Sequence, residues 1–179
     1  VYKGYSPTVH EQDLTYKYPD PVWCVLDPAT RRPHHVVWAY VNKLDQICVD
    51  RELVMEGTLN ELSKAILLTE AKAGYRMKRR LIDPNYGRTP SVSTGKMVIE
   101  ELAAPPFPVA FAEACDDVDA GIFKVREALA FNRLKPLSAT NSPVLFFDRT
   151  RCRRTIRSLQ SYQHKERSGK GQDERDPDE

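Results

Sequence analysis

Two apolar segments that end in the same Asp-Pro dipeptide constrain the fold of this chain more than any other feature. Residues 21–28 read PVWCVLDP, and residues 79–84 read RRLIDP. Proline cannot continue the hydrogen-bond ladder of a sheet and biases the residue before it to an extended backbone. Each segment is therefore a candidate buried strand that stops where Asp27 or Asp83 reaches the surface. Taken singly, each Asp-Pro pair is more simply explained as the start of a turn.

If the two strands are neighbours, the carboxylates of Asp27 and Asp83 meet at one edge of a sheet. Clustered carboxylates are how proteins build divalent-metal sites from oxygen ligands. The chain has 179 residues, of which 41% are hydrophobic and 29% are charged. These values predict one soluble globular domain with a sizeable core. No stretch approaches 18 uncharged apolar residues, so we expect no membrane span.

The basic residues are distributed unevenly, although the net charge of +2 is too small to indicate nucleic-acid binding by itself. Residues 149–157 (RTRCRRTIR) contain five arginines, and residues 76–80 before the second Asp-Pro pair contain four basic side chains. Arg31 and Arg32 follow the first pair. Basic side chains beside both acidic strand ends suit a polyanionic substrate drawn to a metal site. Each cluster alone is more simply explained as a solvated helix face.

The sequence predicts three strands followed by alternating helices and strands. β-branched and aromatic runs place the first strands at residues 22–26, 35–41 and 46–54. A helix follows, with Thr58 and Glu61 as a capping box and Gly74 at its end. Further strands are expected at residues 79–82, 108–112 and 144–147, with helices that begin near residues 93, 116 and 150.

This order predicts an α/β fold: a mixed central sheet, formed by a three-strand antiparallel meander and then parallel strands, with helices on both faces. If the first and fourth strands are central neighbours, their carboxyl ends lie at a topological switch point, where α/β sheets place their sites. We expect the domain to cover residues 21–164. Residues 1–20 are an arm or linker, and residues 165–179 form a flexible segment rich in acidic and basic side chains.

This order of elements resembles the RNase H-like nuclease fold. Five stretches are similar to the C-terminal nuclease domain of the large terminase subunit of tailed bacteriophages. They are VLDPATRRPHHVVWA (residues 25–39), GTLNELSKAI (57–66), LIDPNYG (81–87), DVDAGIFKVREAL (117–129) and FFDRTRCRRTIRSLQSY (146–162). The patterns DPxxRRPH and IDPxxG are moderately specific together and weak apart. The resemblance runs from about residue 21 to the C-terminus.

The resemblance implies a metal-dependent endonuclease that cleaves concatemeric viral DNA during genome packaging by two-metal phosphodiester hydrolysis. In this family clustered acids hold Mg²⁺ or Mn²⁺. Asp27 matches the first catalytic, metal-binding acid and Asp83 the second. The third belongs to a C-terminal acidic motif with an L-R-Y-like stretch that this sequence lacks. Asp176 or Asp178 takes its place, or the third acid is missing.

The resemblance also implies partners and a location. The substrate is double-stranded DNA, and the full protein acts in the host-cell cytoplasm with an N-terminal ATPase domain, a portal and a small terminase subunit. The sequence contains no P-loop motif, so we expect no ATP hydrolysis by this chain. The basic residues expected to contact DNA are Arg31, Arg32, Arg88, Lys96, Arg153 and Arg154.

Several other polar residues have structural explanations that compete with functional ones. His34 and His35 are candidate general bases or DNA contacts, although their place at the start of a strand favours a structural role. The acids at residues 116–119 fit a helix N-terminus, and Asp148 fits a cap after a strand. Two other functions stay open. One is an RNase H-like nuclease of the resolvase or transposase type, and the other is a non-catalytic DNA-binding or docking domain.

Overall fold

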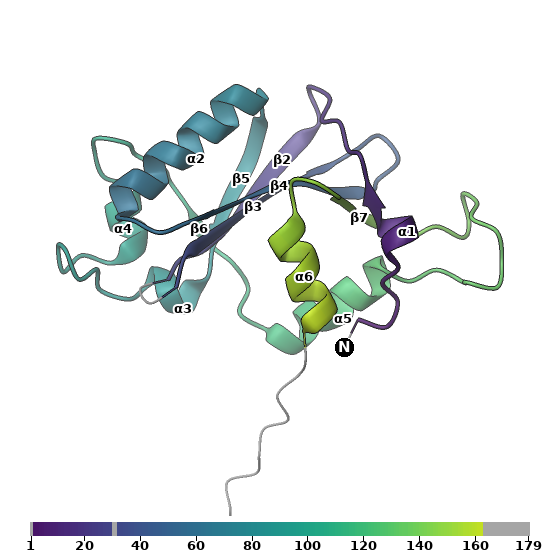
Figure 1. Cartoon of the computed structure of the whole chain (residues 1–179). Helices are drawn as coiled ribbons and strands as arrows, with labels where there is room; N and C mark the ends of the chain where they lie inside the picture. Colours follow the sequence, from purple (N-terminus) through teal and green to yellow (C-terminus); the bar gives the residue numbers. More distant parts are fainter. Residues whose placement is uncertain (1, 30–31, 163–179) are drawn as a thin grey trace, which may run out of the picture.

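A seven-stranded sheet forms the centre of the computed structural model, which describes residues 2–29 and 32–162 (Figure 1). The strands are β1 (Glu11–Gln12), β2 (Pro21–Asp27), β3 (His34–Val41), β4 (Ile47–Met55), β5 (Arg76–Ile82), β6 (Ala112–Glu113) and β7 (Leu145–Asp148). Their order across the sheet is β1-β7-β4-β3-β2-β5-β6. Strand β3 is antiparallel to β2 and β4, and the other adjacent pairs are parallel. The predicted mixed sheet is confirmed.

Helices lie on both faces of this sheet, as the order of elements predicts. They are α1 (Pro7–His10), α2 (Leu59–Ala73), α3 (Pro84–Gly87), α4 (Val98–Leu102), α5 (Val118–Ala128) and α6 (Arg153–Ser161). Figure 1 shows α2 on one side of the sheet and α6 on the other. Successive side chains of β3 follow this division: Trp38 belongs to the core cluster that includes residues of α2 and α4, whereas Val37 packs against the cluster that includes Ile156 of α6. Within the described part of the chain, no helix is long and apolar enough to cross a membrane.

Helix α2 begins and ends at the predicted residues. The Thr58 hydroxyl oxygen accepts from the Glu61 N–H at 3.3 Å, and the Glu61 carboxylate accepts from the Thr58 N–H at 2.8 Å. Gly74 ends the helix with a φ of +64°, a left-handed conformation that glycine adopts without steric strain. Leu62 and Ile66 on the inner face are fully buried, so the helix is fixed both by its caps and by its packing.

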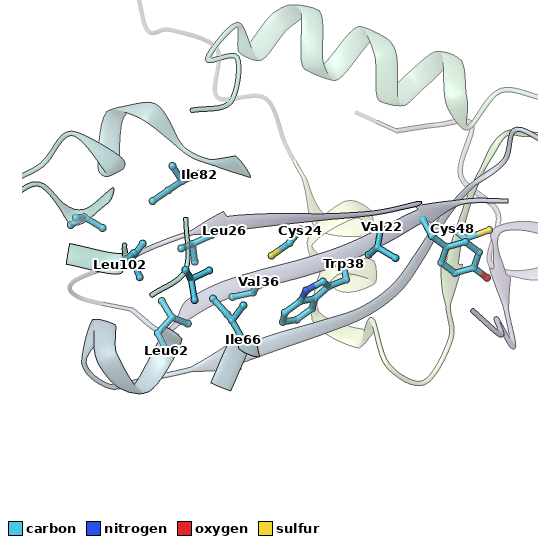
Figure 2. Close-up of a cluster of buried hydrophobic side chains, with 13 residues drawn as sticks. Val22, Cys24, Leu26, Val36, Trp38, Cys48, Leu62, Ile66, Ile82 and Leu102 are labelled. Atoms are coloured by element: carbon cyan, nitrogen blue, oxygen red, sulfur yellow. The ribbon is translucent and has the colours of Figure 1, made fainter. Parts of the chain in front are cut away.

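The main core lies between α2 and the central strands, and Figure 2 shows its side chains. Val22, Cys24 and Leu26 alternate inward along β2 and are buried at 0–1% exposure. Because side chains alternate across a strand, Asp27 leaves β2 on the opposite face, the one that carries α6. The burial pattern of β2 therefore decides on which face of the sheet the candidate site can form.

The clearest differences from the sequence prediction concern three elements, and the two helices among them have a local reason. The helix expected from residue 93 is α4, which begins only at Val98 because the preceding residues form a turn closed by a bridge between Pro90 and Met97. The strand expected at 108–112 is reduced to the two residues of β6. Helix α6 begins at Arg153 instead of near residue 150, because Asp148 first closes a hydrogen-bonded turn.

The stretch predicted as an arm or linker packs against the sheet. Strand β1 pairs in parallel with β7, and Leu14 and Tyr16 pack against the main core. His10 of α1 is fully buried, with Nε2 lying 3.1 Å from the carbonyl oxygen of Leu129. The predicted C-terminal segment at 165–179 lies outside the described residues.

Candidate active site

Asp27 and Asp83 lie at the carboxyl ends of two neighbouring parallel strands. Leu26 of β2 is paired with Ile82 of β5, and the Asp83 N–H donates to the Leu26 carbonyl oxygen at 3.2 Å. The residues that follow this pair, Asp27 and Asp83, therefore stand together at one edge of the sheet. The juxtaposition expected from the sequence is present, and the catalytic role of the two acids stays a prediction.

Each of the two acids has a local partner. Asp27 accepts from Arg32 Nη2 at 3.0 Å through Oδ2 and at 3.3 Å through Oδ1. Asp83 accepts from the Asn85 N–H at 2.9 Å through Oδ1 and so caps the short helix α3. The Asp27 side chain is 46% exposed, so this carboxylate is open to solvent and to ions.

The donor set fits a divalent cation in its chemistry. Carboxylate oxygens are hard ligands, and Mg²⁺ is commonly held by one or two of them together with substrate phosphates and water. Across residues 2–29 and 32–162, no group of three or more His, Cys, Asp or Glu side chains is arranged to hold a metal ion. The proposed third acids, Asp176 and Asp178, lie outside the described residues.

A hollow of about 460 Å³ opens beside Asp27 on the α6 face of the sheet. Arg32 and His35 line it next to Asp27, and Arg154 and Thr155 line it from the first turn of α6. Asp27 and His35 are paired in register on β2 and β3. One carboxylate with two arginines around it forms a surface that suits an anionic backbone held close to a cation.

Glu52 of β4 is a residue next to this hollow that the sequence does not reveal. Its side chain is only 10% exposed. Oε1 accepts from the Arg154 N–H at 2.6 Å, and Oε2 accepts from both the N–H and the hydroxyl of Thr155 at 2.7 Å. His35 Nε2 lies 3.1 Å from Oε2. Burial acts to raise the pKa of Glu52, but the hydrogen bonds from Thr155, Arg154 and His35 outweigh it and hold this pKa below its usual range.

The predicted DNA-contacting residues divide into separate groups. Arg32 and Arg154 line the hollow beside Asp27, and Arg153 is exposed on the same turn of α6 as Arg154. Arg88 and Lys96 are exposed but do not line the hollow. Arg31 lies outside the described residues. The structure thus brings two of these basic side chains next to a candidate metal ligand.

Arg88 is engaged by a carboxylate that the sequence did not single out. Its Nε donates to Glu113 Oε1 at 2.7 Å. Glu113 of β6 is paired in register with Ile82 of β5, so it reaches the same edge of the sheet as Asp83. This ion pair occupies both groups.

His34, Asp117 and Asp148 have the structural roles that the sequence favours. His34 Nδ1 accepts from the Ala29 N–H at 3.1 Å, and Nε2 lies 3.1 Å from the Gly57 carbonyl oxygen. This arrangement holds the loop after Asp27 against the loop before α2. Asp117 caps α5 by accepting from the Ala120 N–H at 2.9 Å.

Asp148 is buried and closes the turn after β7. Its Oδ1 accepts from the N–H groups of Thr150 at 3.0 Å and Arg151 at 2.8 Å, and its Oδ2 accepts from the Leu14 N–H at 3.2 Å. The Arg151 guanidinium lies 2.8 Å from Oδ2. Burial acts to raise the pKa of Asp148, but the bonds from Arg151 and Thr150 outweigh it and hold that pKa below its ordinary value.

Comparison with solved structures identifies the fold as that of large-terminase nuclease domains. The large terminase of a thermophilic bacteriophage superposes with a TM-score of 0.63 at 18% identity over 90% of this chain. The complex of that terminase with ATP-gamma-S gives a TM-score of 0.64 at 15% identity. The P22 large terminase nuclease domain gives 0.61 at 14% identity, covering 91% of this chain and 78% of that domain.

This likeness is one of structure, since no family model and no curated protein matches the chain. The chain spans 36% of the length of the thermophilic phage terminase. Its fold class and its structural resemblance to the terminase nuclease domain are those expected from the sequence.

Proposed function

We propose that this chain is the nuclease domain of a phage large terminase subunit, a metal-dependent endonuclease that cleaves concatemeric viral DNA during packaging. The observation that carries the proposal is the pairing of Leu26 with Ile82, which sets Asp27 and Asp83 side by side. A fold shared with terminase nuclease domains supports a nuclease role. Residue pattern, strand register and fold thus favour the same function.

Asp27 and Asp83 would hold Mg²⁺ or Mn²⁺, with Asp176 or Asp178 as the proposed third ligand. Bound there, a pair of such cations would supply an activated water and stabilise the leaving oxygen of the phosphodiester. Arg32 would release Asp27 and turn to a phosphate. Arg154, on the other side of the hollow, would bind the backbone next to the cleaved bond, and Arg153 would extend this contact along the strand.

The remaining partners follow from the same proposal. The substrate would be double-stranded DNA, contacted also by Arg31, Arg88 and Lys96. In a complete terminase the domain would work with an N-terminal ATPase domain, the portal and the small subunit, in the cytoplasm of the infected cell.

Plasmid nicking in Mn²⁺ tests the assignment of the two acids. Asp27→Asn and Asp83→Asn should each abolish nicking, because the amide removes the negative charge that holds a cation. Asp45→Asn, in an exposed turn between β3 and β4, is the matched control and should nick like the wild type. Equal nicking by all four proteins would overturn the assignment.

A non-catalytic DNA-binding or docking domain is the second candidate. It is favoured by one observation: Asp27 is already paired with Arg32, and the described residues contain no complete acid cluster. In that case the wild type binds duplex DNA in EDTA but nicks no plasmid in Mn²⁺ or Mg²⁺.

A further inference from the structure

The first two residues of α6 are arginines, although the N-terminal end of a helix disfavours positive charge. Arg153 and Arg154 occupy its first turn, which contains no acidic residue, and Cys152 before it provides no side-chain cap. Free N–H groups and the helix dipole make this end electropositive. The turn therefore needs a negative acceptor from elsewhere if Arg154 is to stay beside Asp27.

Glu52 provides that acceptor from β4. Its two carboxylate oxygens accept from the N–H groups of Arg154 and Thr155 and from the Thr155 hydroxyl, at 2.6 to 2.7 Å. Hydrogen bonds to an ionised acceptor are about twice as strong as bonds between neutral groups. Glu52 thus fixes both the start and the orientation of α6.

The same carboxylate is connected to the strand that carries the candidate metal ligand. His35 Nε2 lies 3.1 Å from Glu52 Oε2 and 3.4 Å from the Thr155 hydroxyl. His35 stands opposite Asp27 in the register of β2 and β3. A chain of polar contacts therefore runs from α6 through Glu52 to His35, the residue that is paired in register with Asp27.

We propose that Glu52 is a positioning residue, which acts through the first turn of α6 to hold Arg154 where DNA bound at Asp27 meets it. This inference rests on the proposed nuclease function and deepens it. Glu52 does not touch the DNA, so its loss lowers affinity by releasing Arg154 from the hollow. We therefore expect that replacing Glu52 weakens DNA binding in the wild type but not in a variant that already lacks the Arg154 side chain.

A double-mutant cycle in EDTA tests this without metal or cleavage. Fluorescence anisotropy gives the Kd of a labelled duplex for the wild type, Glu52→Gln, Arg154→Ala and the double variant. Each single variant should bind about fivefold more weakly, and the double variant no more weakly than Arg154→Ala alone. Glu56→Gln, which removes an exposed negative charge directly after β4, is the matched control and should bind like the wild type.

A second pair of variants separates positioning from general destabilisation. Thr155→Ser keeps the hydroxyl that donates to Glu52 and should retain wild-type affinity, whereas Thr155→Val should weaken binding. In Mn²⁺ the KM of Glu52→Gln for plasmid should rise while kcat changes by less than about twofold. If Glu52→Gln does not fold by circular dichroism, the Thr155 pair decides the question.

The outcomes distinguish this inference from the proposed function. If the effects of Glu52→Gln and Arg154→Ala add, or if Glu52→Gln binds like the wild type, the positioning role is overturned even though the nuclease stands. If the wild type neither binds duplex DNA nor nicks plasmid, the proposed function fails first.

Discussion

Arg32 Nη2 lies 3.0 Å from Oδ2 of Asp27, and both side chains are largely open to solvent, at 66% and 46% exposure. An exposed ion pair of this kind contributes about 0–1 kcal/mol to folding. Its consequence is for binding, since the guanidinium occupies the carboxylate that a cation would need. If Asp27 holds a divalent cation as proposed, Arg32 competes with that cation for the carboxylate.

Replacing Arg32 by Gln should strengthen the binding of Mn²⁺ to the DNA-free protein by about two- to fivefold, because the competing charge is gone. Calorimetric titration with Mn²⁺ measures this change. Arg88→Gln, which breaks the pair with Glu113, is the control and should alter Mn²⁺ affinity less. An unchanged affinity of Arg32→Gln for Mn²⁺ would show that Arg32 does not compete with the cation for Asp27. Duplex binding by Arg32→Gln in EDTA should weaken at the same time.

The wild type should bind Mg²⁺ weakly in the absence of DNA. Two carboxylates recruit this ion poorly because it keeps most of its waters, and phosphate oxygens supply the remaining ligands. Calorimetry of Mg²⁺ into free protein should show millimolar or weaker binding, and added duplex with a non-hydrolysable linkage at the cut site should tighten it. Tight binding of Mg²⁺ to the free chain would contradict the two-carboxylate site.

The parts of the fold that the sequence predicted well are those with local signals. Thr58, Glu61 and Gly74 mark the ends of α2 because their hydrogen bonds join residues a few positions apart. Predicting the proximity of Asp27 and Asp83 required only one further rule, that α/β sheets place their sites at the carboxyl ends of strands.

The parts that the sequence could not predict depend on partners far away in the chain. Glu52 lies in an ordinary strand pattern, and its role exists only because the first turn of α6 packs against it. Strand β1 is two residues long and is a strand only through its pairing with β7. No local pattern contains that information, since the same residues would be typical of an exposed loop.

Asp148 should make the protein sensitive to acid. Its pKa is lowered in the folded state, so its stabilising effect is complete above its unfolded pKa of about 3.9 and is lost as pH falls through the lower folded pKa. Asp148→Asn should lower the free energy of unfolding by about 2 kcal/mol at pH 6. Between pH 5 and pH 3, urea denaturation should show a smaller loss of stability in this variant than in the wild type. An equal loss in both proteins would assign the acid sensitivity to other carboxylates, such as Glu52.

The ion pair between Glu70 and Arg80 should be the most costly polar contact to break within the main core. Arg80 Nε donates to Glu70 Oε1 at 2.9 Å and Nη2 to Oε2 at 2.5 Å, and Trp38 Nε1 donates to Oε1 at 3.2 Å. The Glu70 side chain is 7% exposed, and hydrogen bonding to Glu70 raises the pKa of Arg80. The pair joins α2 to β5 and β3.

Removing one partner leaves the other charge buried and unpaired, which costs about 3 kcal/mol or more, whereas replacing both by apolar side chains is often close to neutral. Glu70→Leu and Arg80→Met should therefore each lower the free energy of urea unfolding strongly, and the double variant should lose much less than their sum. Lys78→Met, an exposed change on the same strand, should alter stability by less than about 0.5 kcal/mol. Strictly additive losses in the cycle would mean that the two side chains stabilise the core independently, by packing and not as a pair.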